Sequence, residues 1–175
     1  MILHILLYST LFNNVNVNGI ENDRIFTDYN YFDLALKKCD VNSDWSIHGL
    51  WPEYDSQHWP QFCKPTKLNH KEISKIEDSL NKYWYSCDNN IGNNWSFWNH
   101  EYSKHGTCTG FNQTQYFVVT IQLFKWVQRN GIINKVCGKD NDLNFPNDQC
   151  YGINAYNDWN NQCLIHFNLN MTLRI

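Results

Sequence analysis

The sequence has no excess of positive charge, no internal repeat, and no stretch beyond its N-terminus that approaches membrane-spanning length. Its 14 Lys and Arg residues are outnumbered by 17 Asp and Glu, which gives a net charge of −3 with histidine neutral. This balance argues against a protein that grips nucleic acid through a broad basic surface, but it permits a small, focused anion site. Because 175 residues contain no linker and no block of like charges, we expect a single domain.

The sequence also lacks cysteines at the C-x₂₋₄-C spacing, which argues against a zinc site built from cysteine. It does contain seven cysteines, 8 Trp, 10 Tyr and 10 Phe, and so many aromatic residues exclude intrinsic disorder. Seven cysteines in a short chain predict an oxidising compartment, and their odd number leaves at least one unpaired within the chain.

An apolar run, ILHILLYSTLF, occupies residues 2–12. It has the length of a signal-peptide core and is too short to cross a bilayer. No Lys or Arg precedes it and no small-x-small cleavage site follows it, so a buried N-terminal strand is the alternative. We expect residues 1–18 to be a signal peptide and residues 19–175 to form the domain. The protein is then secreted or enters an endomembrane lumen of the lysosomal or vacuolar kind.

The pattern of apolar residues predicts strands near both ends of the chain and helices between them. The expected strands are 31–36, 45–50 and 163–169. The expected helices follow a cap at Asn69, cover 97–106, and run from a cap at Thr114 to Gly131. On the last strand, the predicted buried face is formed by Cys163, Ile165, Phe167 and Leu169. This arrangement is typical of an α+β fold.

Histidine is concentrated in two segments, WSIHGLWPE at 45–53 and FWNHEYSKHGTC at 97–108. On a helix, Glu101 and His105 share one face because they are four residues apart, and His100 and Lys104 share the adjacent stripe. Such a cluster suits a developing anion, and His48 on a facing strand completes an acid–base pair. Of the four histidines outside these segments, three are interpreted as structural or solvated, namely His4, His70 and His166.

Two alternatives compete with this interpretation. HEYSKH resembles the zinc motif H-E-x-x-H, but His100 and His105 are five residues apart, about 140° around a helix instead of on one face. Lys104 would also place a cation beside the metal. We therefore expect no metal and no other cofactor. The second alternative is that these histidines only pack or cap.

The two segments resemble the signature motifs of the ribonuclease T2 family, in the family's order and at a similar separation. The resemblance covers residues 31–130 and fades beyond them. It implies a central antiparallel sheet that packs against several helices and is cross-linked by disulfides. Relative to this fold, we expect the C-terminus of this chain to be shortened. The resemblance also implies an endoribonuclease that cleaves single-stranded RNA without a metal, through a 2′,3′-cyclic phosphate to 3′-phosphate ends. DNA lacks the 2′-OH nucleophile. We expect a monomer that binds neither DNA nor a membrane.

Carried over residue by residue, the resemblance assigns the catalytic roles. His48 matches the general acid on the leaving 5′-oxygen, and His105 matches the general base that takes the 2′-OH proton. His100 matches a phosphate contact, while Glu101 and Lys104 match the pair that stabilises the pentacoordinate transition state. This complete set argues against the non-enzymatic alternative, a storage, defence or recognition protein on the same scaffold.

The resemblance also places Trp51 and Glu53 in a base-binding pocket. Glu53 stands where the family usually has Asp, so we expect an altered base preference. Trp59 lies near this pocket and either stacks on a base or packs in the core. Tyr102 replaces the usual Trp and is expected to affect packing only.

Finally, the resemblance pairs Cys63 with Cys108 and Cys39 with Cys87. Three cysteines remain for the third bridge, and the choice among them stays open. Cys150 pairs with Cys163, or Cys137 pairs with either Cys150 or Cys163. We favour Cys150–Cys163, which leaves Cys137 unpaired.

Overall fold

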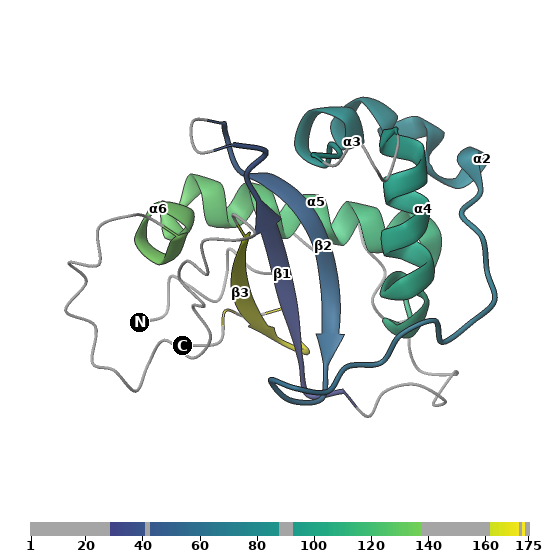
Figure 1. The fold of residues 1–175 in the computed structure, drawn as a ribbon, viewed down its shortest axis with the longest axis horizontal. Coiled ribbons are helices and arrows are strands. Elements are labelled where there is room, and N and C mark those ends of the chain that lie inside the picture. The colour runs from purple at the N-terminus through teal and green to yellow at the C-terminus, as the bar shows by residue number, and fades with distance from the viewer. Residues whose placement is uncertain (1–28, 41–42, 88–92, 138–161, 172, 174–175) are drawn as a thin grey trace.

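A three-stranded antiparallel sheet lies at the centre of the molecule, in the strand order β2–β1–β3 (Figure 1). The strands are β1 (Tyr31–Lys37), β2 (Ser46–Glu53) and β3 (Gln162–Asn168). This computed structural model describes residues 29–40, 43–87, 93–137, 162–171 and 173, so the expected signal peptide and Cys150 lie outside the described residues. All three predicted strands are confirmed. Leu169, however, follows the end of β3 and is 48% exposed instead of buried.

The helices lie between β2 and β3 in the chain, as predicted. They are α2 (His70–Ile73), α3 (Glu77–Tyr83), α4 (Asn94–Lys104), α5 (Gln113–Arg129) and α6 (Ile132–Cys137), with 3₁₀ turns at Ser74–Ile76 and Gly106–Cys108. Asn69 caps α2 as expected, because its side chain accepts from the backbone N–H of Lys71. Within the described ranges, no helix combines the length and apolar character that a membrane span needs.

The N-terminal cap of α5 differs from the prediction. Asn112, not Thr114, caps the helix through a reciprocal capping box with Gln115. The Thr114 hydroxyl instead donates to the backbone carbonyl of Glu72 at 2.6 Å, which joins α5 to α2. A threonine two residues inside the helix thus serves a tertiary contact, which the local pattern does not reveal.

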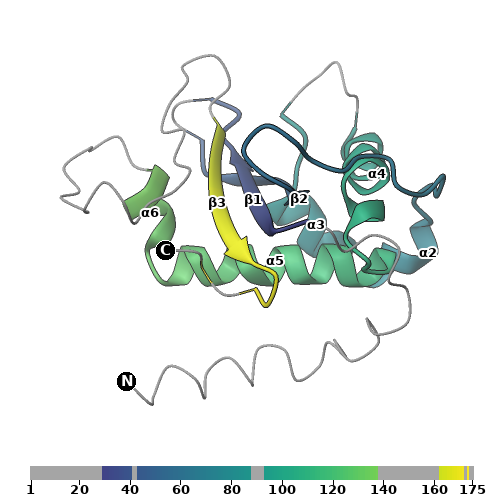
Figure 2. The ribbon, with the colours of Figure 1, turned by 90° about the horizontal axis from the view of Figure 1, so that it is seen from below.

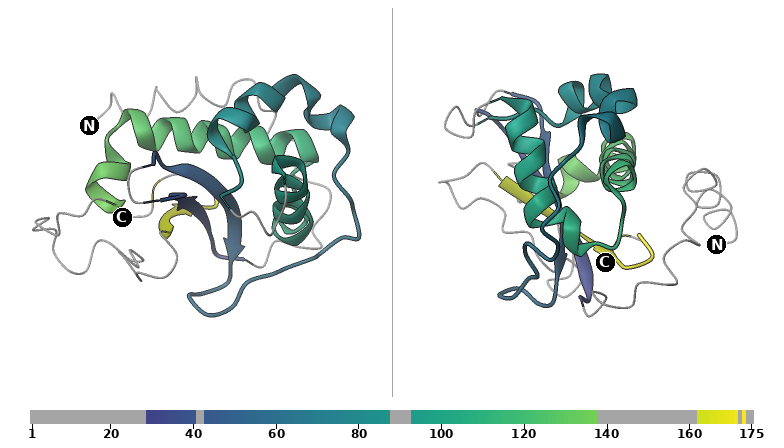
Figure 3. Two further views of the ribbon diagram at one scale, coloured as in Figure 1. Left: turned by 45° about the horizontal axis from the view of Figure 1, so that its top comes forward. Right: turned by 90° about the vertical axis from the view of Figure 1, so that its right-hand side faces the viewer.

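Helix α5 runs across one face of the sheet (Figures 2 and 3). Its predicted inward residues are all buried there: Phe117, Thr120, Leu123, Phe124 and Val127. The strands supply the other half of this core: Phe32, Leu34, Leu36, Ile47 and Leu50 from β1 and β2, and Ile165 and Phe167 from β3. Because side chains alternate along a strand, the intervening residues are left for the opposite face, which carries the candidate site.

Three disulfides connect these elements. Cys39–Cys87 and Cys63–Cys108 are present as expected. The third bridge is Cys137–Cys163, so the favoured pairing Cys150–Cys163 is wrong and Cys137 is not unpaired. Cys163 faces the core side of β3, and the end of α6 packs there with a Cα–Cα distance of 5.8 Å, within the range that a disulfide spans.

Candidate active site

A cavity of about 880 Å³ is lined by strand residues that alternate with the core residues, so it lies on the face of the sheet opposite the core. The structure brings every predicted catalytic and base-binding residue to its lining: His48, Trp51, Glu53, Trp59, His100, Glu101, Lys104 and His105. These residues come from β2, the loop after it, and the C-terminal half of α4. The two sequence segments that stood apart in the chain therefore form one site.

A β-bulge places His48 in this cavity. The register between β1 and β2 shifts between Ala35 and Leu36, whose partners are Gly49 and Ile47, so His48 is the extra residue. Ile47 points into the core, and the bulge allows His48 to join the cavity face, a use of bulges that is frequent beside active sites. The indole N–H of Trp84 donates to the His48 carbonyl at 2.8 Å and holds the bulge in place. Sequence reasoning did not assign Trp84 this role.

Helix α4 carries the other half of the site. It begins after Asn93, whose side chain accepts from the backbone N–H of Ser96. At its far end, Glu101 and His105 are buried at 2% and 4% exposure, while His100 on the neighbouring stripe is exposed. The end of the helix is tied to the loop after β2, because the N–H of Phe62 donates to the Lys104 carbonyl at 2.8 Å and Cys63 is bridged to Cys108.

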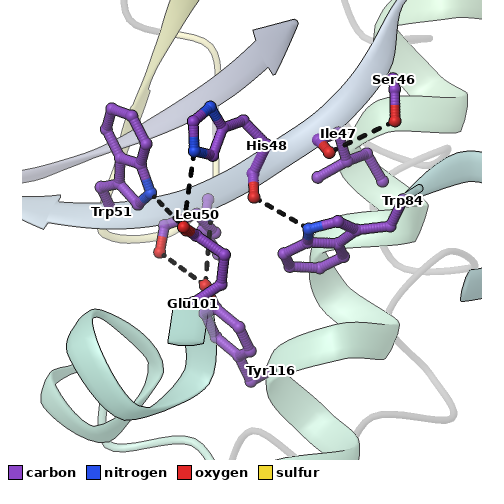
Figure 4. Close-up of polar contacts among 8 residues, drawn as sticks. All are labelled: Ser46, Ile47, His48, Leu50, Trp51, Trp84, Glu101 and Tyr116. Carbon is purple, nitrogen blue, oxygen red and sulfur yellow. Dashed lines mark hydrogen bonds and ion pairs between the residues drawn. The ribbon is translucent and has the colours of Figure 1, made fainter. Parts of the chain in front are cut away.

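The Glu101 carboxylate is the centre of the polar contacts (Figure 4). Its Oε2 accepts from the indole N–H of Trp51 at 2.9 Å, and its Oε1 lies 3.5 Å from Nε2 of His48. Burial alone would raise the pKa of Glu101, but the hydrogen bond and positive charge of His48, with help from His105 and Trp51, hold that pKa below its ordinary value. Glu101 is therefore an ionised carboxylate, and it forms an ion pair with His48 when His48 is protonated.

His105 has a contrasting environment. Its ring stacks on Trp51 with 5.0 Å between the centroids, and its Nδ1 is buried with no hydrogen-bond partner among the described residues. Burial lowers the pKa of His105 from 6.5 to about 4, and the Glu101 carboxylate opposes this shift. Positive charge on the neighbours Lys104, His48 and His100 reinforces it. His105 is thus a neutral imidazole above about pH 4.

Of the predicted base-binding residues, Trp51 belongs to the Glu101 cluster, whereas Glu53 is the last residue of β2 and Trp59 lies in the loop after it. Glu53 is buried, and this burial, followed by the charges of Asp33 and Asp55, raises its pKa to about 8. Trp59 is 45% exposed while lining the cavity, so it does not pack in the core. Its loop is braced by His58, whose Nδ1 lies 2.9 Å from the Asp55 carboxylate. This end of the cavity therefore offers an aromatic face and a carboxylic acid that is neutral below about pH 8.

Sequence reasoning missed several residues of the cavity, and two of them form an ion pair. Asp33 on β1 and His166 on β3 both line the cavity, and His166 Nδ1 forms an ion pair with the Asp33 carboxylate. His166 was interpreted as structural or solvated, and its position between apolar residues on a strand was the available signal that it faces away from the core. His70, by contrast, is solvated as predicted and pairs with Glu77. In the part of the chain that the structure describes, no group of three or more His, Cys, Asp or Glu could hold a metal ion.

Gly49 leaves the room in which Trp51 and Glu101 meet. A Cβ atom at this position would overlap both the indole nitrogen of Trp51 and the Glu101 carboxylate. We therefore expect Gly49→Ala to separate these groups, to lower the free energy of unfolding by about 1–3 kcal/mol, and to reduce activity. Urea denaturation measures the change in the free energy of unfolding. In Gly49→Ala/Trp51→Phe, which lacks the indole nitrogen, part of the lost stability should return; unchanged stability in the single variant would contradict the crowding.

Comparisons with known proteins identify the family to which the chain is similar. The model of the ribonuclease T2 family matches residues 25–162. The chain is 42% identical over 77 residues to intracellular ribonuclease LX of Solanum lycopersicum, which is 43% of this chain and 32% of that protein. It is 42% identical over 84 residues to ribonuclease DdI of Dictyostelium discoideum, which is 46% of this chain and 35% of that protein. The matched segments therefore span about a third of these relatives' length.

The fold is also similar to solved structures. The RNase-related protein from Calystegia sepium superposes with a TM-score of 0.60 and 27% sequence identity, over 83% of this chain and 89% of that one. The predicted α+β architecture with a disulfide-linked antiparallel sheet is confirmed by this likeness and by the structure itself. Since the family model covers more than half of the chain, the protein belongs to the ribonuclease T2 family.

Proposed function

We propose that this protein is an endoribonuclease that cleaves single-stranded RNA with two histidines and no metal. The observation that carries the proposal is the division of charge around Glu101. His48 lies 3.5 Å from a buried, ionised carboxylate that forms an ion pair with it when it is protonated, and His105 is buried against Trp51, where its neutral form is favoured. Two imidazoles in one cavity, one suited to donate a proton and the other to accept one, are what acid–base catalysis requires.

In the first step, neutral His105 accepts the proton of the ribose 2′-OH, and the 2′-oxygen attacks the adjacent phosphorus. The bond from phosphorus to the 5′-oxygen breaks, and protonated His48 gives its proton to that leaving oxygen. A 2′,3′-cyclic phosphate and a free 5′-OH result. In the return step the two histidines exchange roles: His48 accepts a proton from water, which attacks the cyclic phosphate, and His105 donates to the 2′-oxygen.

Positive charge for the phosphate comes from α4. Lys104 and His100 both line the cavity from α4, and in this proposal they contact the scissile phosphate. Charges placed in advance around a developing pentacoordinate anion stabilise it more than they stabilise the ground state. Glu101 does not bind the anion in this scheme; it holds the charge and the orientation of His48.

The proposed base site is Trp51, Glu53 and Trp59. Below about pH 8 the Glu53 side chain is a neutral carboxylic acid, so it offers both an O–H donor and a carbonyl acceptor to a base edge. The exposed Trp59 ring is available to stack on a base. This combination supports a broad base preference that changes when Glu53 ionises.

Three disulfides support the proposal that the protein works in an oxidising compartment, secreted or inside an endomembrane lumen. We propose that it acts there as a monomer on RNA and not on DNA. The 2′-OH is itself the nucleophile, so discrimination against DNA is chemical.

The decisive experiment maps the products of a defined single-stranded RNA in excess EDTA between pH 3 and pH 8. We expect 2′,3′-cyclic phosphate ends first and 3′-phosphate ends later, at a rate that EDTA does not change. We also expect kcat/KM to fall about tenfold per pH unit below about 4, because His105 then carries a proton and no longer accepts one. DNA of the same sequence is the control. Activity lost in EDTA would indicate a metal-dependent hydrolase, and no cleavage at any pH would favour a storage or recognition protein.

A further inference from the structure

The cavity contains a second histidine–carboxylate pair that the proposed reaction does not use. His166 on β3 and Asp33 on β1 are 133 residues apart in the chain, and Nδ1 of His166 contacts Oδ1 of Asp33. Their side chains are only 11% and 6% exposed, yet both residues line the cavity that holds His48 and His105. A buried carboxylate that fixes one ring nitrogen leaves the other, Nε2, to face outward.

The register of the sheet places this pair beside the proposed active centre. Asp33 is paired with Trp51 on one side and with His166 on the other, so the three side chains form a row across β2, β1 and β3. Neighbouring strands lie about 4.8 Å apart, so His166 stands roughly 9.6 Å from Trp51 along this row. The pair therefore lies outside the Glu101 cluster but within reach of the same bound nucleic-acid strand.

The orientation of the His166 ring is held from two sides. Asp33 binds Nδ1, and the Tyr31 ring meets the imidazole edge-on at a centroid distance of 5.1 Å. Among the described residues, the contact with Asp33 is the one hydrogen bond of the imidazole. Of the cavity-lining positions on β1 and β3, only His166 is able to carry positive charge; the others are Tyr31, Asp33, Leu164 and Asn168.

We propose that the Asp33–His166 pair is a second phosphate subsite, which binds the phosphate group next to the scissile one through the Nε2–H of His166. The inference rests on the proposed function, because it takes a nucleotide chain to be the occupant of the cavity. Protonated His166 and ionised Asp33 form a neutral pair, and its exposed N–H is a charge-assisted donor to an anionic oxygen.

The surrounding acidic groups are compatible with this ligand. Glu53 and Asp55 lie at the base end of the cavity, and the charge of Asp33 acts on Glu53. Glu53 is neutral below about pH 8, and the Asp55 carboxylate contacts Nδ1 of His58, with which it forms an ion pair when His58 is protonated. Lys104 and His100 lie on α4, where the scissile phosphate is proposed to bind.

The test compares three substrates in the unmutated protein and in His166→Ala. A dinucleoside monophosphate has the scissile phosphodiester alone, the same dinucleotide with a terminal phosphate adds a phosphomonoester, and a trinucleoside diphosphate adds a second phosphodiester. We expect His166→Ala to raise KM about tenfold for a substrate with a second phosphate, with kcat unchanged. The dinucleoside monophosphate should be unaffected. The substrate that shows the effect identifies the phosphate as terminal or internal.

The matched control is His70→Ala, which removes an exposed histidine paired with Glu77 outside the cavity and should change neither constant. An equal rise in KM for all three substrates, or no rise for any, would overturn the subsite. If His166→Ala does not fold, His166→Gln and Asp33→Asn retain side-chain volume and polarity and are measured in its place.

Binding separates this inference from the proposed function. Calorimetric titration with a nucleoside 3′-monophosphate and with the 3′,5′-bisphosphate requires no cleavage. A preference for the bisphosphate that disappears in His166→Ala supports the subsite even if the protein cleaves no RNA. Equal affinity for the two ligands in the unmutated protein contradicts it even if RNA is cleaved.

Discussion

Replacing His105 by alanine is expected to lower kcat for RNA cleavage by about 10²–10⁴-fold, because the proposed general base is removed. His105 is buried and stacked on Trp51, which fixes its ring, and it is neutral above about pH 4. Its imidazole is therefore in the form that accepts the 2′-OH proton. His48→Ala is expected to reduce kcat by a similar factor through loss of the proposed acid. The measurement is single-turnover cleavage of an RNA oligonucleotide.

The combination of the two variants is more informative than either alone. If His48 and His105 act in one proton-transfer scheme, the double variant should be only slightly slower than the slower single variant, since each loss already abolishes the concerted transfer. Thermal unfolding of each variant shows whether the fold survives. His70→Ala, with an exposed histidine, should cleave at the rate of the unmutated protein. Cleavage that persists at that rate in His105→Ala would refute the assignment.

Much of the fold follows from local patterns. The three strands and the inward face of α5 are visible in the sequence because apolar residues alternate or recur at helical spacing, and the core of the structure is built from these residues. The prediction of a cap at Thr114 instead of Asn112 arises because both residue types cap helices. Gln115, three residues after Asn112, is the local signal of the capping box, whereas the contact of Thr114 with α2 has none. Tertiary contacts of this kind leave no local signal.

The candidate site also has one part that local sequence patterns predict and another part that they do not. The Glu101 cluster was predictable because its residues lie within two short motifs and because helical spacing brings Glu101 and His105 to one face. Asp33 and His166 were not, because their proximity depends on the pairing of β1 with β3 across most of the chain. The Cys137–Cys163 bridge is one of the alternatives that the sequence leaves open and not the favoured one, for a similar reason, since choosing it requires the packing of α6 against β3.

Glu101→Gln tests whether one carboxylate divides the roles of the two histidines. The substitution preserves size, and an amide oxygen still accepts from the Trp51 indole, but the negative charge 3.5 Å from His48 is removed. Protonated His48, the proposed acid, then lacks the carboxylate that pairs with it. We expect kcat to fall about 10²-fold, at the lower end of the loss of a proton-transfer group, because His48 itself remains.

The pH profile distinguishes this effect from a loss of structure. The Glu101 carboxylate raises the pKa of His105 against the dominant effect of burial, so its removal should move the acidic limb of kcat/KM from about pH 4 to lower pH. A variant that is merely less stable would lose activity toward acid at higher pH instead. Glu77→Gln is the matched control, because it removes an exposed carboxylate paired with His70 and should leave the limb in place. An acidic limb that stays near pH 4 in Glu101→Gln would mean that Glu101 does not set the charge of His105.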